Sequence, residues 1–79
     1  MVIVSKAYIQ THKEVVEDLI EILLKTEGAV FESDNNDQVV TIFEPSPEIL
    51  EALHGHFLSD EEYEELLNNP VDEIQFYWD

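Results

Sequence analysis

The sequence predicts a small α+β domain built on one four-stranded sheet, and three observations support this fold class. The chain contains 44% hydrophobic residues with only two Gly and three Pro, which is typical of a folded domain rather than an acidic disordered tail. Two S/T-x-x-E motifs each precede an amphipathic run, as helix starts do. Runs of alternating or β-branched apolar residues lie between and around them. With 79 residues, we expect a single domain, 1–79, with a small core.

The first part of the chain predicts a strand followed by a helix. Residues 2–9 are rich in β-branched and apolar side chains, which favour a strand. Thr11 to Glu14 is a capping box, so we expect a helix from about residue 12 to residue 26. Its apolar side chains recur at helical spacing, and Gly28 stands where a C-terminal cap belongs.

The middle of the chain predicts a hairpin and a second helix. Residues 29–33 and 38–44 form two short strand patterns, and the Asp and Asn residues between them tolerate left-handed turn geometry. Ser46 then supplies an N-cap, and Pro47 supplies a first helical position. The apolar positions of this helix are Ile49, Leu50, Leu53 and Phe57.

The last part of the chain predicts a short helix and a final strand. Ser59 to Glu62 is the second capping box, and the helix that it starts ends before Pro70. Residues 71–78 alternate apolar and polar side chains, which is the pattern of a half-buried strand.

The resulting order, β-α-β-β-α-(α)-β, predicts a ferredoxin-like βαββαβ fold with a short extra helix before the last strand. Two right-handed crossovers place both main helices on one face of a four-stranded antiparallel sheet, in the strand order 4-1-3-2, and leave the other face open. Tyr8 and Tyr77 are out of phase with the core pattern, so we expect them on the open face or at an edge. The side chains expected to face the helices are Ile3, Ile9, Val40, Ile42, Ile74, Phe76 and Trp78.

The charge distribution excludes several kinds of partner. Nineteen carboxylates oppose three Lys and no Arg, for a formal net charge of -16, and no Lys or Arg follows Lys25. Such a chain is unsuited to binding nucleic-acid phosphates or an anionic membrane directly. We therefore expect a basic protein as partner, with this chain acting as a monomer or homodimer. Adaptation to high salt would give the same composition.

Catalysis, metal binding and export are not predicted. The chain lacks Cys, Arg, a Gly-rich phosphate loop and a Ser-His-Asp set, so we expect no catalytic residues and no enzyme activity. His54 and His56 would point about 200° apart on a helix, and no further motif completes a ligand set, so we expect no metal and no cofactor. The N-terminus lacks the features of a signal peptide, and a cytoplasmic location is expected.

The acidic residues of the second half are the candidate functional residues. Residues 60–65 hold five acids in six positions, and acids three or four apart on a helix lie about 5 to 6 Å apart. This step is close to the phosphate spacing along one nucleic-acid strand, so a carboxylate array is able to mimic a phosphate backbone. The candidate partner-binding residues are Asp60, Glu61, Glu62, Glu64, Glu65, Glu44, Glu48, Glu51, Asp72, Glu73 and Tyr77.

Two resemblances to known families follow. The short, Arg-free, acidic chain resembles in type the DNA-mimic inhibitors that phages and mobile elements use against restriction, CRISPR and repair enzymes, which implies inhibition of a basic DNA- or RNA-binding protein. Residues 28–31, 39–44 and 74–78 are similar to the NapD maturation chaperones, whose ferredoxin-like sheet binds a twin-arginine signal peptide. That second resemblance implies the alternative function of binding an Arg-containing peptide, although the segment from His54 to Asn69 departs from the pattern.

Overall fold

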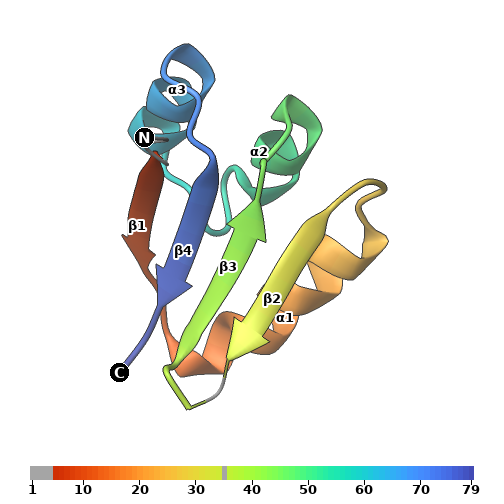
Figure 1. The fold of residues 1–79 in the computed structure, drawn as a ribbon, viewed down its shortest axis with the longest axis vertical. Helices are drawn as coiled ribbons and strands as arrows, with labels where there is room; N and C mark the ends of the chain where they lie inside the picture. Colours follow the sequence, from red (N-terminus) through yellow and green to blue (C-terminus); the bar gives the residue numbers. More distant parts are fainter. Residues whose placement is uncertain (1–4, 35) are drawn as a thin grey trace, which may run out of the picture.

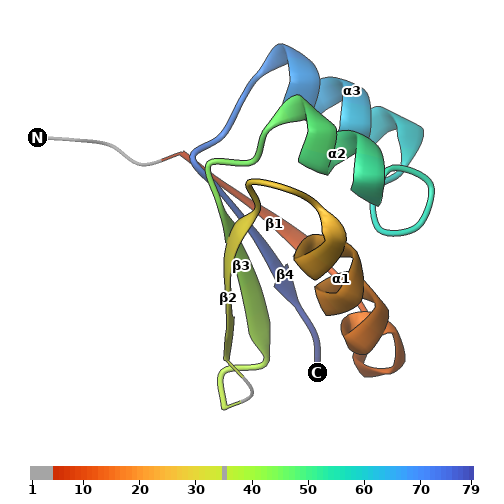
Figure 2. The same cartoon turned by 90° about the vertical axis from the view of Figure 1, so that its right-hand side faces the viewer.

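Four strands and three helices make up the computed structural model, which describes residues 5–34 and 36–79 and is α+β with a mixed sheet (Figure 1). The three helices lie on one face of the sheet, and the other face carries no helix (Figure 2). Residues 2–4 of the first predicted strand, including Ile3, lie outside the described residues. In chain order the elements are β1 Lys6–Gln10, α1 Lys13–Lys25, β2 Val30–Asp34, β3 Val39–Phe43, α2 Pro47–Leu53, α3 Asp60–Asn68 and β4 Glu73–Tyr77.

The strand order differs from the predicted ferredoxin-like order. The sheet runs β1-β4-β3-β2, and β1 pairs with β4 in parallel, whereas the other two pairings are antiparallel. The fully antiparallel order 4-1-3-2 is therefore wrong for this chain. The reason is the connection between β3 and β4, because a single helix would carry the chain to the opposite end of the sheet. Here α2 and α3 pack against each other and return the chain to the end where β3 finishes, so β4 runs back beside β3 (Figure 1).

The start of α1 corrects a second prediction. Thr11 is not the N-cap. Its backbone N–H, which a capping box would direct to the Glu14 side chain, donates instead to Tyr77 O at 2.8 Å and thereby extends the pairing of β1 with β4. His12 takes the N-cap position instead, without a side-chain hydrogen bond to the helix. Sheet pairing has therefore outcompeted a local capping motif. At the other end of α1, Thr26 is the C-cap, and Gly28 adopts the left-handed φ of 83° that glycine favours.

The hairpin forms as predicted. The second helix begins as predicted but ends at Leu53, so Phe57, which was expected on this helix, lies in the turn that follows it. Asp34 Oδ1 accepts the N–H groups of Asn36 at 2.9 Å and Asp37 at 3.1 Å, which tightens the turn between β2 and β3. Ser46 caps α2 by accepting the Ile49 N–H at 3.4 Å, one residue before the helical proline. Backbone N–H groups in a turn or in the first turn of a helix have no acceptor within the helix or strand. These side-chain oxygens accept their hydrogen bonds instead.

The core lies between the helix-bearing face of the sheet and the helices. Every helix-facing residue predicted within the described part of the chain is buried, and Phe76 of β4 is fully enclosed. Its ring packs edge-on against Phe57, with ring centroids 6.4 Å apart. The fully buried side chains are Leu19, Leu23, Val40, Ile42, Ile49, Leu53, Ile74 and Phe76.

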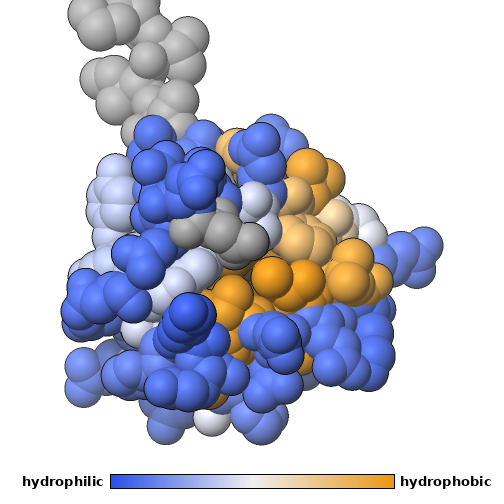
Figure 3. Space-filling model, turned by 90° about the horizontal axis from the view of Figure 1, so that it is seen from below, coloured by the Kyte–Doolittle hydropathy of each residue, from blue (hydrophilic) through white to orange (hydrophobic). Residues whose placement is uncertain are grey.

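The opposite face of the sheet is open, as predicted, and Tyr8 and Tyr77 are both exposed there. Val30 of the edge strand β2 is also exposed on this face, since it pairs with Phe43 out of phase with the buried Ile42. Seen from the lower end of the molecule, hydrophobic surface gathers on one side and hydrophilic side chains surround it (Figure 3).

Candidate partner-binding surface

Helix α3 carries half of the candidate acids, and its own sequence fixes its position. Ser59 Oγ accepts the Glu62 N–H at 3.1 Å, and Glu62 Oε1 accepts the Ser59 N–H at 2.9 Å, so the predicted capping box is confirmed. Buried Leu66 and half-buried Tyr63 attach the helix to the rest of the domain. Glu62 therefore stabilises the helix and is not a free surface charge.

Asp60, the first residue of α3, also has a partner within the chain. Its Oδ1 lies 2.5 Å from Nε2 of His54, the C-cap residue of α2. The His54 ring in turn stacks on the Tyr63 ring, with centroids 4.2 Å apart and an interplanar angle of 5°. His54 therefore links α2 to α3 through both an aromatic stack and a polar contact.

The remaining acids of α3 are exposed and unpaired. Glu61, Glu64 and Glu65 are exposed, and none forms an ion pair with the Lys and His side chains of the described residues. Residues 61 and 64, and residues 61 and 65, are one helical turn apart, so these carboxylates are neighbours on the helix surface. Of the five acids that the sequence places in this helix, three remain available for a partner.

The lysines neutralise acids elsewhere on the molecule. Lys6 Nζ lies 3.7 Å from Glu73 Oε2 on the open face of the sheet, and Lys25 Nζ lies 2.8 Å from Glu21 Oε1 on α1. The hydrogen bond and the charge of Lys25 hold the pKa of Glu21 below its ordinary value, and Glu21 raises the pKa of Lys25 in return. Within residues 5–34 and 36–79, compensation of charge by lysine is thus confined to α1 and to the sheet.

A second group of candidate acids surrounds α2. Glu44, Glu48 and Glu51 are exposed, and α2 packs against α3, so both helices lie at the same end of the molecule (Figure 2). Glu44 has a left-handed φ of 47°, and its N–H donates to Asp72 O at 2.7 Å, which joins the end of β3 to the start of β4. The acids of α2 and α3 therefore occupy one region.

The candidates on β4 are divided between two regions. Asp72 Oδ2 accepts the Ser5 N–H at 3.0 Å, and Glu73 pairs with Lys6, so both acids are engaged at the end of the sheet nearer α3. Tyr77 lies at the other end of β4, about 13 Å further along the strand at 3.3 Å per residue. The eleven candidate residues consequently do not form one continuous surface.

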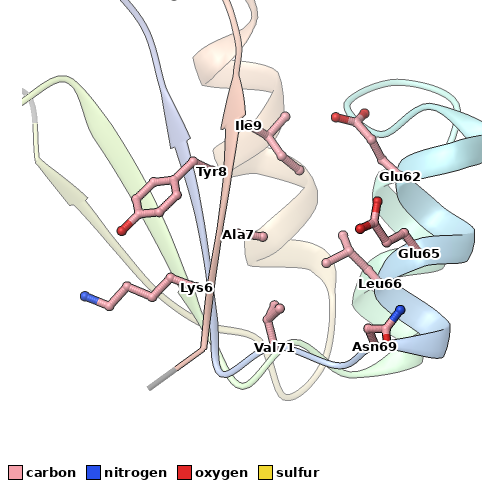
Figure 4. Close-up of a pocket in the computed structure, with 9 residues that line it drawn as sticks. All are labelled: Lys6, Ala7, Tyr8, Ile9, Glu62, Glu65, Leu66, Asn69 and Val71. Atoms are coloured by element: carbon pink, nitrogen blue, oxygen red, sulfur yellow. The ribbon is translucent and has the colours of Figure 1, made fainter. Parts of the chain in front are cut away.

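A groove between β1 and α3 was missed by the sequence reasoning. It has a volume of about 310 Å³, and Figure 4 shows Ala7 and Ile9 pointing toward α3 while Glu62, Glu65 and Leu66 point back toward β1. The ferredoxin-like order hides this groove, because it places β1 inside the sheet. The second helix between β3 and β4 was predicted, but its effect was not: it reverses the chain and leaves β1 at an edge of the sheet.

Neither a metal site nor a membrane span is found among the described residues. No three His, Asp or Glu side chains of residues 5–34 and 36–79 are arranged to hold a metal ion. In the same part of the chain, no helix has the length and apolar character needed to cross a bilayer.

Comparisons of this chain with protein-family models, with curated proteins and with solved structures find no match. The charge and geometry described above therefore carry the functional argument.

Proposed function

We propose that this chain is an acidic, cytoplasmic binding module that inhibits a basic DNA- or RNA-binding protein by presenting carboxylates in place of backbone phosphates, as phage and mobile-element anti-defence proteins do. One observation carries the proposal. Glu61 and Glu64 are exposed, have no cationic partner among the described residues, and lie on a helix that a capping box holds in place.

The physical argument concerns both spacing and net charge. Carboxylates one turn apart lie about 5 to 6 Å from each other, a step that a groove evolved for phosphates is able to accept. A net charge of -16 also steers a basic partner toward the module and makes association depend strongly on salt. Binding to a cationic groove relieves the mutual repulsion that the free module bears.

The test is competition with nucleic acid. A basic partner is captured from native host lysate at low salt and purified, and its affinity for its own DNA or RNA is measured with and without this protein. The variant E61Q/E64Q keeps side-chain size and helix propensity while removing two exposed charges. Its matched control, E17Q/E27Q, removes two exposed charges on and just after α1.

We expect E61Q/E64Q to bind the partner more weakly and with a flatter salt dependence, whereas E17Q/E27Q binds like the unmodified protein. Nucleic-acid binding that is unchanged at saturating amounts of this protein would show that mimicry is wrong. Equal losses of affinity in both variants would show that binding depends on net charge alone and not on the acids of α3. Full affinity in E61Q/E64Q with a loss in E48Q/E51Q would move the site from α3 to α2.

A further inference from the structure

Strand β1 has a free edge beside α3. Ser5 O accepts the Glu73 N–H at 3.1 Å, and the Thr11 N–H donates to Tyr77 O at 2.8 Å, so odd-numbered residues bond β4 along this strand. Because successive residues of a strand direct their backbone groups to opposite sides, the N–H and C=O of Lys6, Tyr8 and Gln10 point away from β4. In the described part of the chain, no strand pairs with this side of β1.

The groove described above runs along this free edge. Its floor is apolar, formed by Ala7 and Ile9 of β1, Leu66 of α3 and Val71. Its outer wall is polar, because α3 points Glu62, Glu65 and Asn69 toward β1 (Figure 4). An extended chain laid along β1 would place every second side chain over this floor, facing the carboxylates.

The charges around the groove specify its occupant. Glu65 has no cationic partner among the described residues, and Lys6 points to the opposite side of β1, where it pairs with Glu73 (Figure 4). A second copy of this chain would bring a further formal charge of -16 to the same place. An extended segment with Arg or Lys at alternate positions has the complementary charge, and its aliphatic stems match the apolar floor.

We propose that the β1 edge and the adjoining groove bind an extended basic peptide segment, which adds as a fifth strand beside β1 and directs cationic side chains at Glu65. This is a second site, distinct from the outward face of α3, and it does not depend on phosphate mimicry. Main-chain hydrogen bonds to β1 supply affinity, and the carboxylate supplies the preference for a cation.

The probe is a short blocked peptide in which Arg alternates with Thr, titrated into the full chain at low salt. Backbone amide signals of Lys6, Tyr8 and Gln10 are expected to shift in NMR spectra. The variant E65Q should bind about tenfold more weakly, as expected for the loss of a charged hydrogen-bond partner, while E17Q binds normally. A peptide with Glu in place of Arg should not bind, and its binding as tightly as the Arg peptide would overturn the proposal.

Two further experiments test strand addition itself. Y8P removes the outward N–H of an edge position that tolerates proline, and it should bind more weakly than Y8A, which keeps that N–H. If Y8P fails to fold, the peptide is modified instead of the protein. N-methylation of all its Arg residues, or of all its Thr residues, removes the backbone N–H groups along one edge of the added strand. Loss of binding with only one methylated set is expected, whereas equal behaviour of both sets excludes strand addition.

These results remain separable from those for the α3 surface. E61Q/E64Q is expected to bind the Arg peptide within about twofold of the unmodified protein, because neither residue lines the groove. A peptide that fails to bind overturns the edge site and leaves the nucleic-acid competition result as it stands.

Discussion

The capping box of α3 allows a quantitative prediction about how the proposed binding helix is held. Ser59→Ala removes the oxygen that accepts the Glu62 N–H at 3.1 Å, while the reciprocal bond from the backbone N–H of residue 59 to the Glu62 carboxylate remains possible. Replacing an N-cap Ser by Ala costs about 1 kcal/mol of stability. Unfolding 79 residues at about 2.1 cal/mol/K each gives an entropy of about 0.17 kcal/mol/K, so Tm should fall by about 6 °C.

The N-cap of α2 provides the matched control. Ser46 Oγ lies 3.4 Å from the Ile49 nitrogen, at the long limit for a hydrogen bond, and no reciprocal side-chain bond returns to Ser46. Ser46→Ala should therefore cost about half as much, with a fall in Tm of about 3 °C.

Thermal unfolding followed by circular dichroism, at matched pH and salt, measures both variants. Amide hydrogen exchange then shows whether the loss at Ser59 is concentrated in residues 60–68, since a nine-residue helix is marginal without its cap and its packing. Equal falls in Tm for the two variants, or an unchanged Tm in Ser59→Ala, would refute the assignment of α3 stability to its capping box.

Three further outcomes are expected. Raising NaCl from about 0.01 M to 0.15 M shortens the Debye length from about 30 Å to about 8 Å and should raise Tm, whereas a flat response would show that the carboxylates are too dispersed to repel one another. Ile42→Val, at a fully buried site, should cost about 0.5 to 1.5 kcal/mol in urea titrations, while Leu24→Ala, at a residue that is 72% exposed, should leave the urea midpoint nearly unchanged. The N–H groups of Asp37 and then Asn36 lower the pKa of Asp34, so its stabilising effect is complete above the ordinary Asp pKa of about 3.9 and disappears as pH falls through the lower folded value. The difference in urea midpoint between Asp34→Ala and the unmodified chain should therefore be present at neutral pH and vanish in strong acid, and a difference that is the same at both pH values would contradict this reasoning.

The helices and strands were predictable because their signals are local. A cap, a helical proline and a turn rich in Asp and Asn act within a few residues, so α2, α3 and the hairpin follow directly from their own sequences. Thr11 shows the limit of this reasoning, because its backbone N–H has two possible destinations and the sheet provides the one that the structure uses. The choice between these two acceptors depends on where β4 lies. The first residue of β4 is 62 residues further along the chain than Thr11.

The strand order and the binding groove were not predictable from local signals. Whether the chain crosses the sheet once or returns between β3 and β4 depends on α2 packing against α3, through contacts such as the stack of His54 on Tyr63. The amino-acid composition locates the acids but not their partners. It was the structure that assigned Asp60 to His54 and Glu62 to the Ser59 cap, and that left Glu61, Glu64 and Glu65 exposed.

The parallel pairing of β1 with β4 has a consequence for how the chain assembles. Lys6 is opposite Glu73, so β1 has no sheet partner during synthesis until residues 73–77 have left the ribosome. The β2–β3 hairpin needs only its own few residues, whereas β4 must enter between two strands made earlier. Slow, long-range closure of this kind leaves apolar strands uncovered for longer. The excess of carboxylates then protects the nascent chain, because like-charged copies repel one another before any sheet has closed.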